Sequence, residues 1–190
     1  MRTHNLGQIN EKLEGKKVEI AGWIDTIREH GKVVFVDLRD RYGKLQCVAN
    51  SKSKDFEEIK KLSKESCIKI VGQVNKRPKG TENKDLESGK VELSIEKVEV
   101  FNSCPRLPFE INEKELNEDL RLKYRFLDLR SNRMQKNLLL RNNVLKAVRD
   151  FFYDEGFIEI ETPILAKSTP EGARDYIVPS RNFPGKFYAL

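Results

Sequence analysis

Histidine and cysteine, which often build catalytic or metal sites, are scarce here: the 190 residues include two histidines and three cysteines. The cysteines, Cys47, Cys67 and Cys104, are odd in number, widely spaced and free of any C-x-x-C pair. This pattern excludes a disulfide framework and a zinc site, and it predicts free thiols that are buried or half-buried. Because histidine occurs only at His4 and His30, the chain also lacks a Ser/His/Asp or Cys/His catalytic set.

Long apolar runs are missing as well. No stretch approaches the roughly 20 residues that a membrane-spanning helix needs, so we expect no membrane partner. The opening residues, MRTHNLGQIN, lack the apolar centre of a secretory signal. We therefore expect a cytoplasmic protein. Nor is there a glycine-rich phosphate-binding loop of the nucleotide-binding type.

Charge is abundant, and the balance is basic. Lysine and arginine total 36 against 30 aspartates and glutamates, a net charge of +6. Clustered cations would favour a polyanion such as nucleic acid. A lysine-rich solvated surface explains the same numbers equally well, so composition leaves both interpretations open.

The first hundred residues alternate apolar and polar side chains between turn signals, which is typical of short strands. A helical spacing of Phe56, Ile59 and Leu62, preceded by Ser53 and Asp55 as candidate caps, predicts one helix among them. This order predicts a five-stranded OB-fold barrel. The expected strands cover residues 16–27, 33–40, 45–50, 67–77 and 91–102, and the expected helix covers residues 53–66.

The pattern of apolar residues changes from strand-like to helical after CPRLPF, residues 104–109, whose two prolines indicate a boundary. Residues 112–130 and 131–156 have helical patterns, the second ending at Gly156. FIEIETPIL, residues 157–165, predicts a strand in which Pro163 forces an edge position or a kink. The expected fold is an all-β OB barrel of five strands plus a helix, followed by an α+β segment. The expected limits are 1–104 for the barrel, 105–120 for a linker and 121–190 for the second domain.

An OB barrel can stack unpaired bases on exposed rings and bind them with polar side chains. Phe35, Arg28, Gln46 and Arg77 are candidates for such a face. By pattern alone Phe35 in VVFVD could instead belong to the barrel core.

The sequence resembles the bacterial-type aspartyl-tRNA synthetases, which are class II aminoacyl-tRNA synthetases. The resemblance runs through GWIDTIREHGKVVFVDLRDRYGKLQCV, RLKYRFLDLR, GFIEIETPIL and TPEGARDYIVPSRNFPGKFYAL, and covers essentially the whole chain. It implies an amino-terminal fragment: an anticodon-binding OB domain, then the start of the class II catalytic domain.

The resemblance assigns roles to several barrel residues. It implies that Phe35 stacks on the central anticodon base, that Gln46 reads this base, and that Arg28 contacts the third base. Glu92 falls where the family reads the first base, and Arg77 belongs to the same surface. His30 and Thr81 fall at positions that bear on discrimination between tRNA-Asp and tRNA-Asn; His30, which we expect in a turn, resembles the relaxed form that charges both.

In the second domain the resemblance implies an aspartate-site lid. Glu171 corresponds to the acid that contacts the ammonium group of bound aspartate, with Gly172, Arg174 and Asp175 supporting the loop. A turn containing PEG and flanking charges is otherwise an ordinary surface loop. GFIEIETPIL resembles class II motif 1, which implies a symmetric homodimer with Pro163 at its interface.

The implied reaction is ATP-dependent aspartylation of tRNA through aspartyl-adenylate, with Mg²⁺ at the ATP phosphates. In the family, the class II motifs 2 and 3 and the metal-binding acids lie beyond the equivalent of Leu190. We therefore expect no complete catalytic set, no metal site and no bound cofactor in this chain, and no catalysis by it alone. A standalone synthetase-derived RNA-binding protein is the alternative; a related asparagine or lysine enzyme fits the TPEGARDY loop less well.

Overall fold

The computed structural model describes residues 2–84, 86–168 and 174–190. The chain forms two compact units, Met1–Glu110 and Ile111–Leu190. The domain limits expected from the sequence stay a prediction. Within the described residues, no helix combines the length and the apolar character needed to cross a bilayer.

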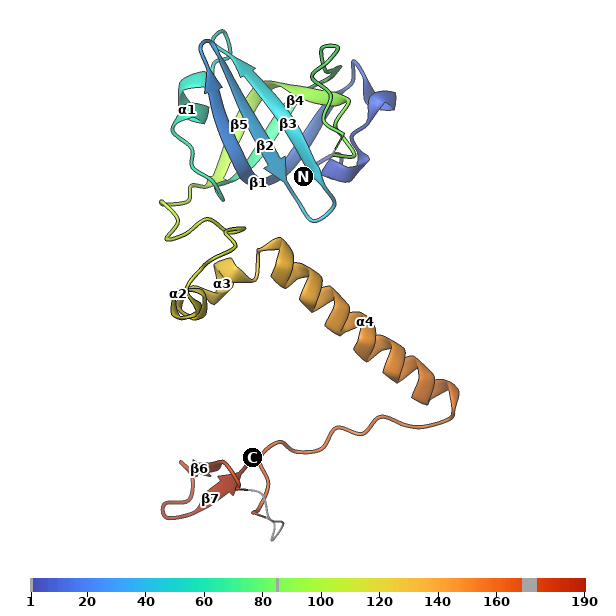
Figure 1. Cartoon of the computed structure of the whole chain (residues 1–190), viewed down its shortest axis with the longest axis vertical. Helices are drawn as coiled ribbons and strands as arrows, with labels where there is room; N and C mark the ends of the chain where they lie inside the picture. Colours follow the sequence, from blue (N-terminus) through green and yellow to red (C-terminus); the bar gives the residue numbers. More distant parts are fainter. Residues whose placement is uncertain (1, 85, 169–173) are drawn as a thin grey trace. The chain divides into compact units, whose positions relative to one another are not determined.

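The first unit is a closed barrel of five strands (Figure 1). β3 and β5 pair in parallel and the other neighbours are antiparallel, with β4 closing the barrel against β1. This is the five-stranded barrel predicted from the alternation of apolar and polar residues. The strands are β1 (Lys17–His30), β2 (Val33–Arg39), β3 (Lys44–Asn50), β4 (Cys67–Lys76) and β5 (Val91–Asn102), in the spatial order β1-β2-β3-β5-β4.

Strict alternation fills the barrel. In β2 and β3 every second side chain is buried, and the residues between them face outward. Cys47 belongs to this core, and its burial raises the pKa of the thiol, whereas Cys67 and Cys104 are half-buried. None of these three cysteines is in a disulfide, as predicted. The inward set of these two strands is Val34, Val36, Leu38, Leu45, Cys47 and Ala49.

The single barrel helix is shorter than predicted. Two 3-10 turns, η1 (Leu6–Gln8) and η2 (Glu11–Leu13), precede β1, and α1 covers only Phe56–Lys60. Asp55 is the N-cap residue of α1, as predicted, but its side chain makes no capping hydrogen bond to the helix. Its carboxylate instead accepts a 2.6 Å hydrogen bond from the backbone N–H of Val98, because tertiary contact with β5 offers a buried donor.

β1 is longer than predicted, and this changes the position of His30. The turn predicted between the strands at 16–27 and 33–40 is shorter than expected and does not contain His30, since β1 runs to His30, which pairs with Val33. The turn itself is only two residues long, and Gly31 takes its φ of +59° without the steric penalty of a side chain. Arg28 and His30 therefore lie on a strand beside β2.

In the second unit the helix predicted over residues 112–130 is wrong in extent, because α2 covers Glu118–Lys123 and α3 covers Arg125–Asp128. The long helix is confirmed: α4 spans Asn132–Asp154, and the Ser131 hydroxyl accepts from the N–H of Met134 at its start. Gly156 follows it with φ +83°.

The predicted strand at residues 157–165 is wrong. A strand needs a neighbour for its backbone groups, and no described strand pairs with these residues. Phe157, Ile158, Ile160 and Ile164 are consequently exposed. The only regular pairing in this part of the described chain is a short hairpin of β6 (Ile177–Pro179) with β7 (Phe187–Ala189), flanked by a bridge between Ala166 and Ala189.

Candidate nucleic-acid interface

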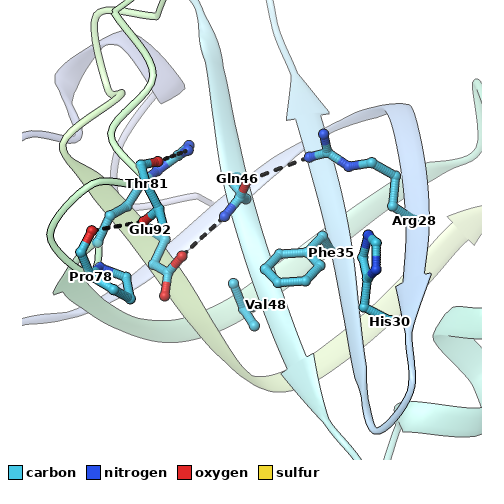
Figure 2. Close-up of a pocket in the computed structure, with 9 residues that line it drawn as sticks. Arg28, His30, Phe35, Gln46, Val48, Pro78, Thr81 and Glu92 are labelled. Carbon is cyan, nitrogen blue, oxygen red and sulfur yellow. Dashed lines mark hydrogen bonds between the residues drawn. The ribbon is translucent and has the colours of Figure 1, made fainter.

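A cavity of about 360 Å³ opens on the outer face of the barrel (Figure 2). Side chains from β1, β2, β3 and β5 line it, together with the loop that connects β4 to β5. The structure thus brings together all seven barrel residues predicted from the sequence, although their individual roles stay predictions. The lining residues are Arg28, His30, Phe35, Gln46, Val48, Arg77, Pro78, Thr81 and Glu92.

Phe35 faces out of the barrel because its neighbours Val34 and Val36 face in. Its ring is half-buried, so it is not part of the core, the alternative that the VVFVD pattern left open. The His30 ring meets Phe35 edge to face with 5.9 Å between ring centroids. The two rings and Val48 lie side by side in the lining of the cavity, and together they form a surface suited to the flat face of a base.

A chain of polar contacts crosses this face. Nη2 of Arg28 donates to both carboxylate oxygens of Asp37, at 3.1 and 2.9 Å, and at 3.4 Å to Oε1 of Gln46. Nε2 of Gln46 donates at 3.0 Å to Glu92. Because a donor holds one end of the amide and an acceptor holds the other, the orientation of Gln46 is fixed.

Asp37 was not among the predicted residues. Asp37 lies two residues after Phe35 on β2, so its side chain points to the same outer face. This spacing of two is the sequence signal that could have identified it. Its contribution is to hold the Arg28 guanidinium in place beside Gln46.

Arg77 is buried, in contrast to Arg28. Its Nε donates to the carbonyl of Val91 at 3.1 Å, and Nη1 donates to the carbonyl of Thr81 at 3.4 Å. The Thr81 hydroxyl in turn donates to the carbonyl of Pro78 at 2.8 Å. Arg77 therefore fastens the β4–β5 loop to the barrel, and its Nη2 is buried without a partner among the described residues.

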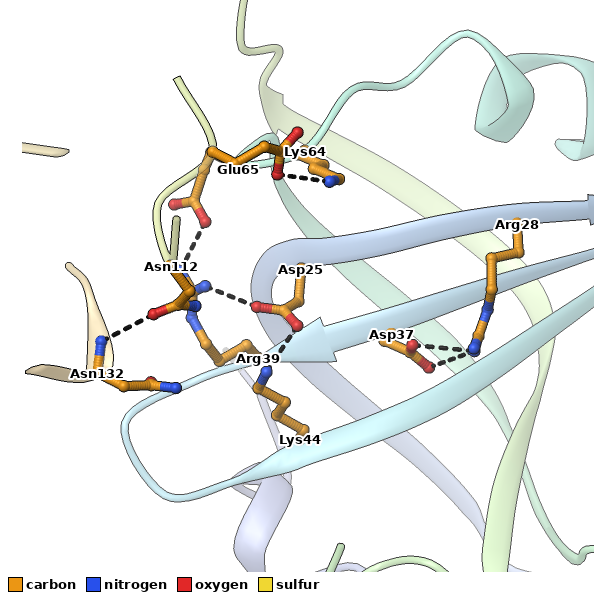
Figure 3. Close-up of polar contacts among 10 residues, drawn as sticks. Asp25, Arg28, Asp37, Arg39, Lys44, Lys64, Glu65, Asn112 and Asn132 are labelled. Carbon is orange, nitrogen blue, oxygen red and sulfur yellow. Dashed lines mark hydrogen bonds and ion pairs between the residues drawn. The ribbon is translucent and has the colours of Figure 1, made fainter. Parts of the chain in front are cut away.

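A second polar network lies outside the cavity and links β1, the end of β2, the start of β3 and Glu65, which precedes β4 (Figure 3). Asp25 accepts from Arg39 at 2.9 Å and from Lys44 at 2.6 Å, and Arg39 also donates to Glu65 at 2.8 Å. Burial raises the pKa of Asp25, but the hydrogen bonds and charges of Lys44 and Arg39 outweigh it, so the pKa lies below its usual value.

Asp37 has the opposite shift. Burial raises the pKa of Asp37 above 3.8, and the Arg28 guanidinium lowers it only in part. Because the pKa of Asp37 in the folded state exceeds that in the unfolded chain, its contribution to stability is lost as pH rises through the folded-state pKa. The contribution of Asp25, whose folded pKa is lowered, is instead lost as pH falls.

We predict that a carboxyl-carbon NMR titration will find Asp37 titrating above 3.8 and Asp25 below it. Arg28→Gln should raise the pKa of Asp37 further, because it removes the main opposing charge, and should leave Asp25 unchanged. A lower pKa for Asp37 than for Asp25 would contradict this account of the site.

The predicted residues of the second unit are not gathered into a site. Glu171 and Gly172 lie outside the described residues. Arg174 is exposed, while Asp175 is half-buried and accepts a hydrogen bond from the Ser168 hydroxyl. Pro163 is exposed in the irregular segment before the hairpin.

The described residues also offer no metal centre, since none of their histidine, cysteine, aspartate and glutamate side chains form a group of three or more suited to a metal ion. They therefore do not offer the oxygen ligands that a bound Mg²⁺ would need.

Comparisons with known proteins agree with this architecture. Residues 18–101 match the family model described as an OB-fold nucleic acid binding domain, and residues 117–190 match the model for class II tRNA synthetases (D, K and N). The fold resembles asparaginyl-tRNA synthetase from Pyrococcus horikoshii, with a TM-score of 0.82, 27% identity, and coverage of 98% of this chain and 42% of that one. The two units thus define an OB-fold nucleic-acid-binding domain joined to a class II tRNA synthetase segment.

The most specific similarity is to curated sequences. An aspartate–tRNA(Asp/Asn) ligase from Thermotoga neapolitana is 50% identical over the whole chain, and one from Hydrogenobaculum sp. is 52% identical. The chain is therefore a homologue, over its full length, of the aspartate–tRNA ligases. It spans about a third of these relatives, 33% and 32% of their lengths.

Proposed function

We propose that the barrel binds the anticodon loop of a tRNA as part of an aspartate–tRNA ligase. One observation supports this most directly. A half-buried ring, an amide of fixed orientation, an arginine and a glutamate line a single cavity on the outer face of an OB barrel. Stacking surfaces next to oriented polar groups are what unpaired RNA bases require.

The fixed amide of Gln46 also suggests which base edge it reads. An amide oxygen has two lone pairs and an amide nitrogen two hydrogens, and Arg28 and Glu92 engage one of each. One acceptor and one donor remain. A base that presents a donor beside an acceptor, as uracil does with N3–H and O4, complements this edge while Phe35 stacks against its face.

The activity of the complete enzyme is proposed by extension from its relatives. It would join aspartate to tRNA with ATP and Mg²⁺, and Glu171 would contact the ammonium group of aspartate. Gly172, Arg174 and Asp175 would support that loop, and Pro163 would lie at a homodimer interface. The exposed apolar side chains of residues 157–165 support a partner surface there.

Binding of hairpin RNAs tests the barrel assignment. We expect a hairpin with the aspartate anticodon to bind, and a change of its central base to weaken binding by about tenfold, the loss of one well-placed pair of hydrogen bonds. Fluorescence anisotropy of labelled hairpins measures this. Equal affinity for hairpins with unrelated anticodons would contradict anticodon recognition.

The charging of tRNA-Asn is a separate proposal. His30 lines the cavity next to Phe35, and Thr81 lies on the loop that Arg77 fastens. We propose that these residues permit charging of both tRNA-Asp and tRNA-Asn, the two tRNAs that the names of the related ligases give. Aminoacylation of purified tRNA-Asn by the complete enzyme tests it, and the absence of product would remove the proposal.

The 190 residues alone should not catalyse adenylate formation. We expect ATP–pyrophosphate exchange with aspartate to stay at background for this chain, because the described residues supply no metal-binding set. Exchange above background would contradict this expectation. A standalone RNA-binding protein would also bind RNA without catalysing exchange. The reading frame after Leu190 would distinguish such a protein from part of a ligase.

A further inference from the structure

A second hollow, of about 600 Å³, lies on the barrel outside the cavity described above. It is formed where β3 ends, by the segment that leads into α1 and by the middle of β5. Three of its residues are lysines. The lining residues are Asn50, Lys52, Ser53, Lys54, Asp55, Ile95, Glu96 and Lys97.

The hollow continues the outer face that carries the first cavity. Along β3, Val48 lines the cavity and Asn50, two residues on, lines the hollow. Two residues of a strand span about 7 Å, and residues two apart face the same side. β5 runs parallel to β3 here, with Val48 opposite Ser94, and Glu92 in the cavity is followed on the same face by Glu96 in the hollow.

The cations of the hollow are available to a ligand. Lys52, Lys54 and Lys97 are exposed, and within the described parts of the chain none of them forms an ion pair. The two acids are already engaged, because Asp55 accepts from the backbone of Val98 and Glu96 pairs with Lys17. The net charge left unpaired at the hollow is therefore positive and favours binding of an anion.

One neutral group supports the same conclusion. The Ser53 hydroxyl oxygen is buried and has no hydrogen-bond partner among the described residues. A buried hydroxyl without a partner is unfavourable. Because Ser53 lines the hollow, an anionic oxygen bound there would offer this hydroxyl an acceptor.

We propose that this hollow binds the phosphodiester backbone of the RNA strand whose base stacks on Phe35. The inference rests on the proposed function of the barrel and extends its interface across β3 and β5. Lys52, Lys54 and Lys97 neutralise backbone phosphate, and the neighbouring cavity reads the bases. Phosphate contacts position a strand and carry no sequence information, so this surface contributes affinity without anticodon specificity.

The test compares the salt dependence of hairpin binding by the intact chain and by K52Q/K54Q/K97Q. Loss of one phosphate contact lowers the slope of log affinity against log salt by about 0.7, which is a fivefold loss of affinity at about 0.1 M salt. We expect at least this change. The ratio of affinities for matched and central-base-changed hairpins should stay constant. K52R/K54R/K97R, which keeps the charges, should keep the slope.

A matched control removes three exposed lysines that line neither cavity nor hollow, as K12Q/K16Q/K136Q. An equal loss in this control would assign the effect to net charge and overturn the proposal. So would an unchanged slope in K52Q/K54Q/K97Q when the unmodified chain binds. Failure of the unmodified chain to bind any hairpin would instead refute the proposed function, and this inference with it.

Discussion

Replacing Gly72 by alanine is expected to lower the free energy of unfolding of the barrel by about 3 kcal/mol, the upper part of the usual range for overpacking. A Cβ at this buried position would lie 2.2 Å from the carbonyl oxygen of Ser94 and 3.0 Å from Cγ of Leu93. The closest atom belongs to the backbone of the neighbouring strand. It cannot move aside without disturbing the β4–β5 pairing, where the register shifts between Val71 and Gly72.

Gly31→Ala is the matched control. Gly31 has φ +59° and no atom within 4 Å of an added Cβ, so alanine there adds conformational strain without a clash. That strain costs about 1–2 kcal/mol. Urea unfolding followed by the fluorescence of Trp23, the single tryptophan, reports on the barrel. A loss for Gly72→Ala no greater than that for Gly31→Ala would show that the strands adjust to the added methyl group.

The second large effect is expected at Phe35. Phe35→Ala should weaken binding of the aspartate-anticodon hairpin by about 10- to 100-fold, because stacking of one base on an aromatic ring contributes about 1–3 kcal/mol. The reason is geometric: the ring lies half-buried between His30 and Val48 and offers its face to the cavity. Anisotropy titrations at fixed salt measure the loss, and Phe35→Trp should retain binding.

Phe101→Ala provides the control for a lost aromatic ring. Phe101 lies on β5 and is 53% exposed, but it does not line the cavity. Its removal should leave hairpin affinity within about twofold, since no base reaches it. If Phe101→Ala and Phe35→Ala weaken binding equally, the ring of Phe35 is not a specific stacking surface.

Alternation was sufficient to predict the barrel. Each of its strands contributes inward apolar residues and outward polar ones, and this period-two pattern is local, so it can be read directly from the residues. The same pattern could not decide whether Phe35 faces in or out. In VVFVD the flanking residues are apolar as well, and only the pairing of β1, β2 and β3 showed that Val34 and Val36 fill the core.

Contacts between distant residues explain where the structure differs from the predictions. Asp55 had the sequence position of a helix cap, but a backbone donor 43 residues away competes for its carboxylate. Residues 157–165 have strand-like side chains, but an extended segment becomes a strand only when a partner meets its backbone. His30 was expected in a turn because no local signal shows that β2 holds β1 in register up to its last residue.

The sequence alone was enough to predict the order of the strands and helix of the barrel, cysteines without a disulfide, and the residues that line the cavity, because side-chain periodicity and motif resemblance are written in consecutive residues. The tertiary structure alone decided that Asp37 holds Arg28, that Glu92 fixes Gln46 across 46 positions of sequence, and that three lysines border a hollow beside the cavity. Each of these depends on strand register, and a shift of one residue would turn the same side chains to the opposite face.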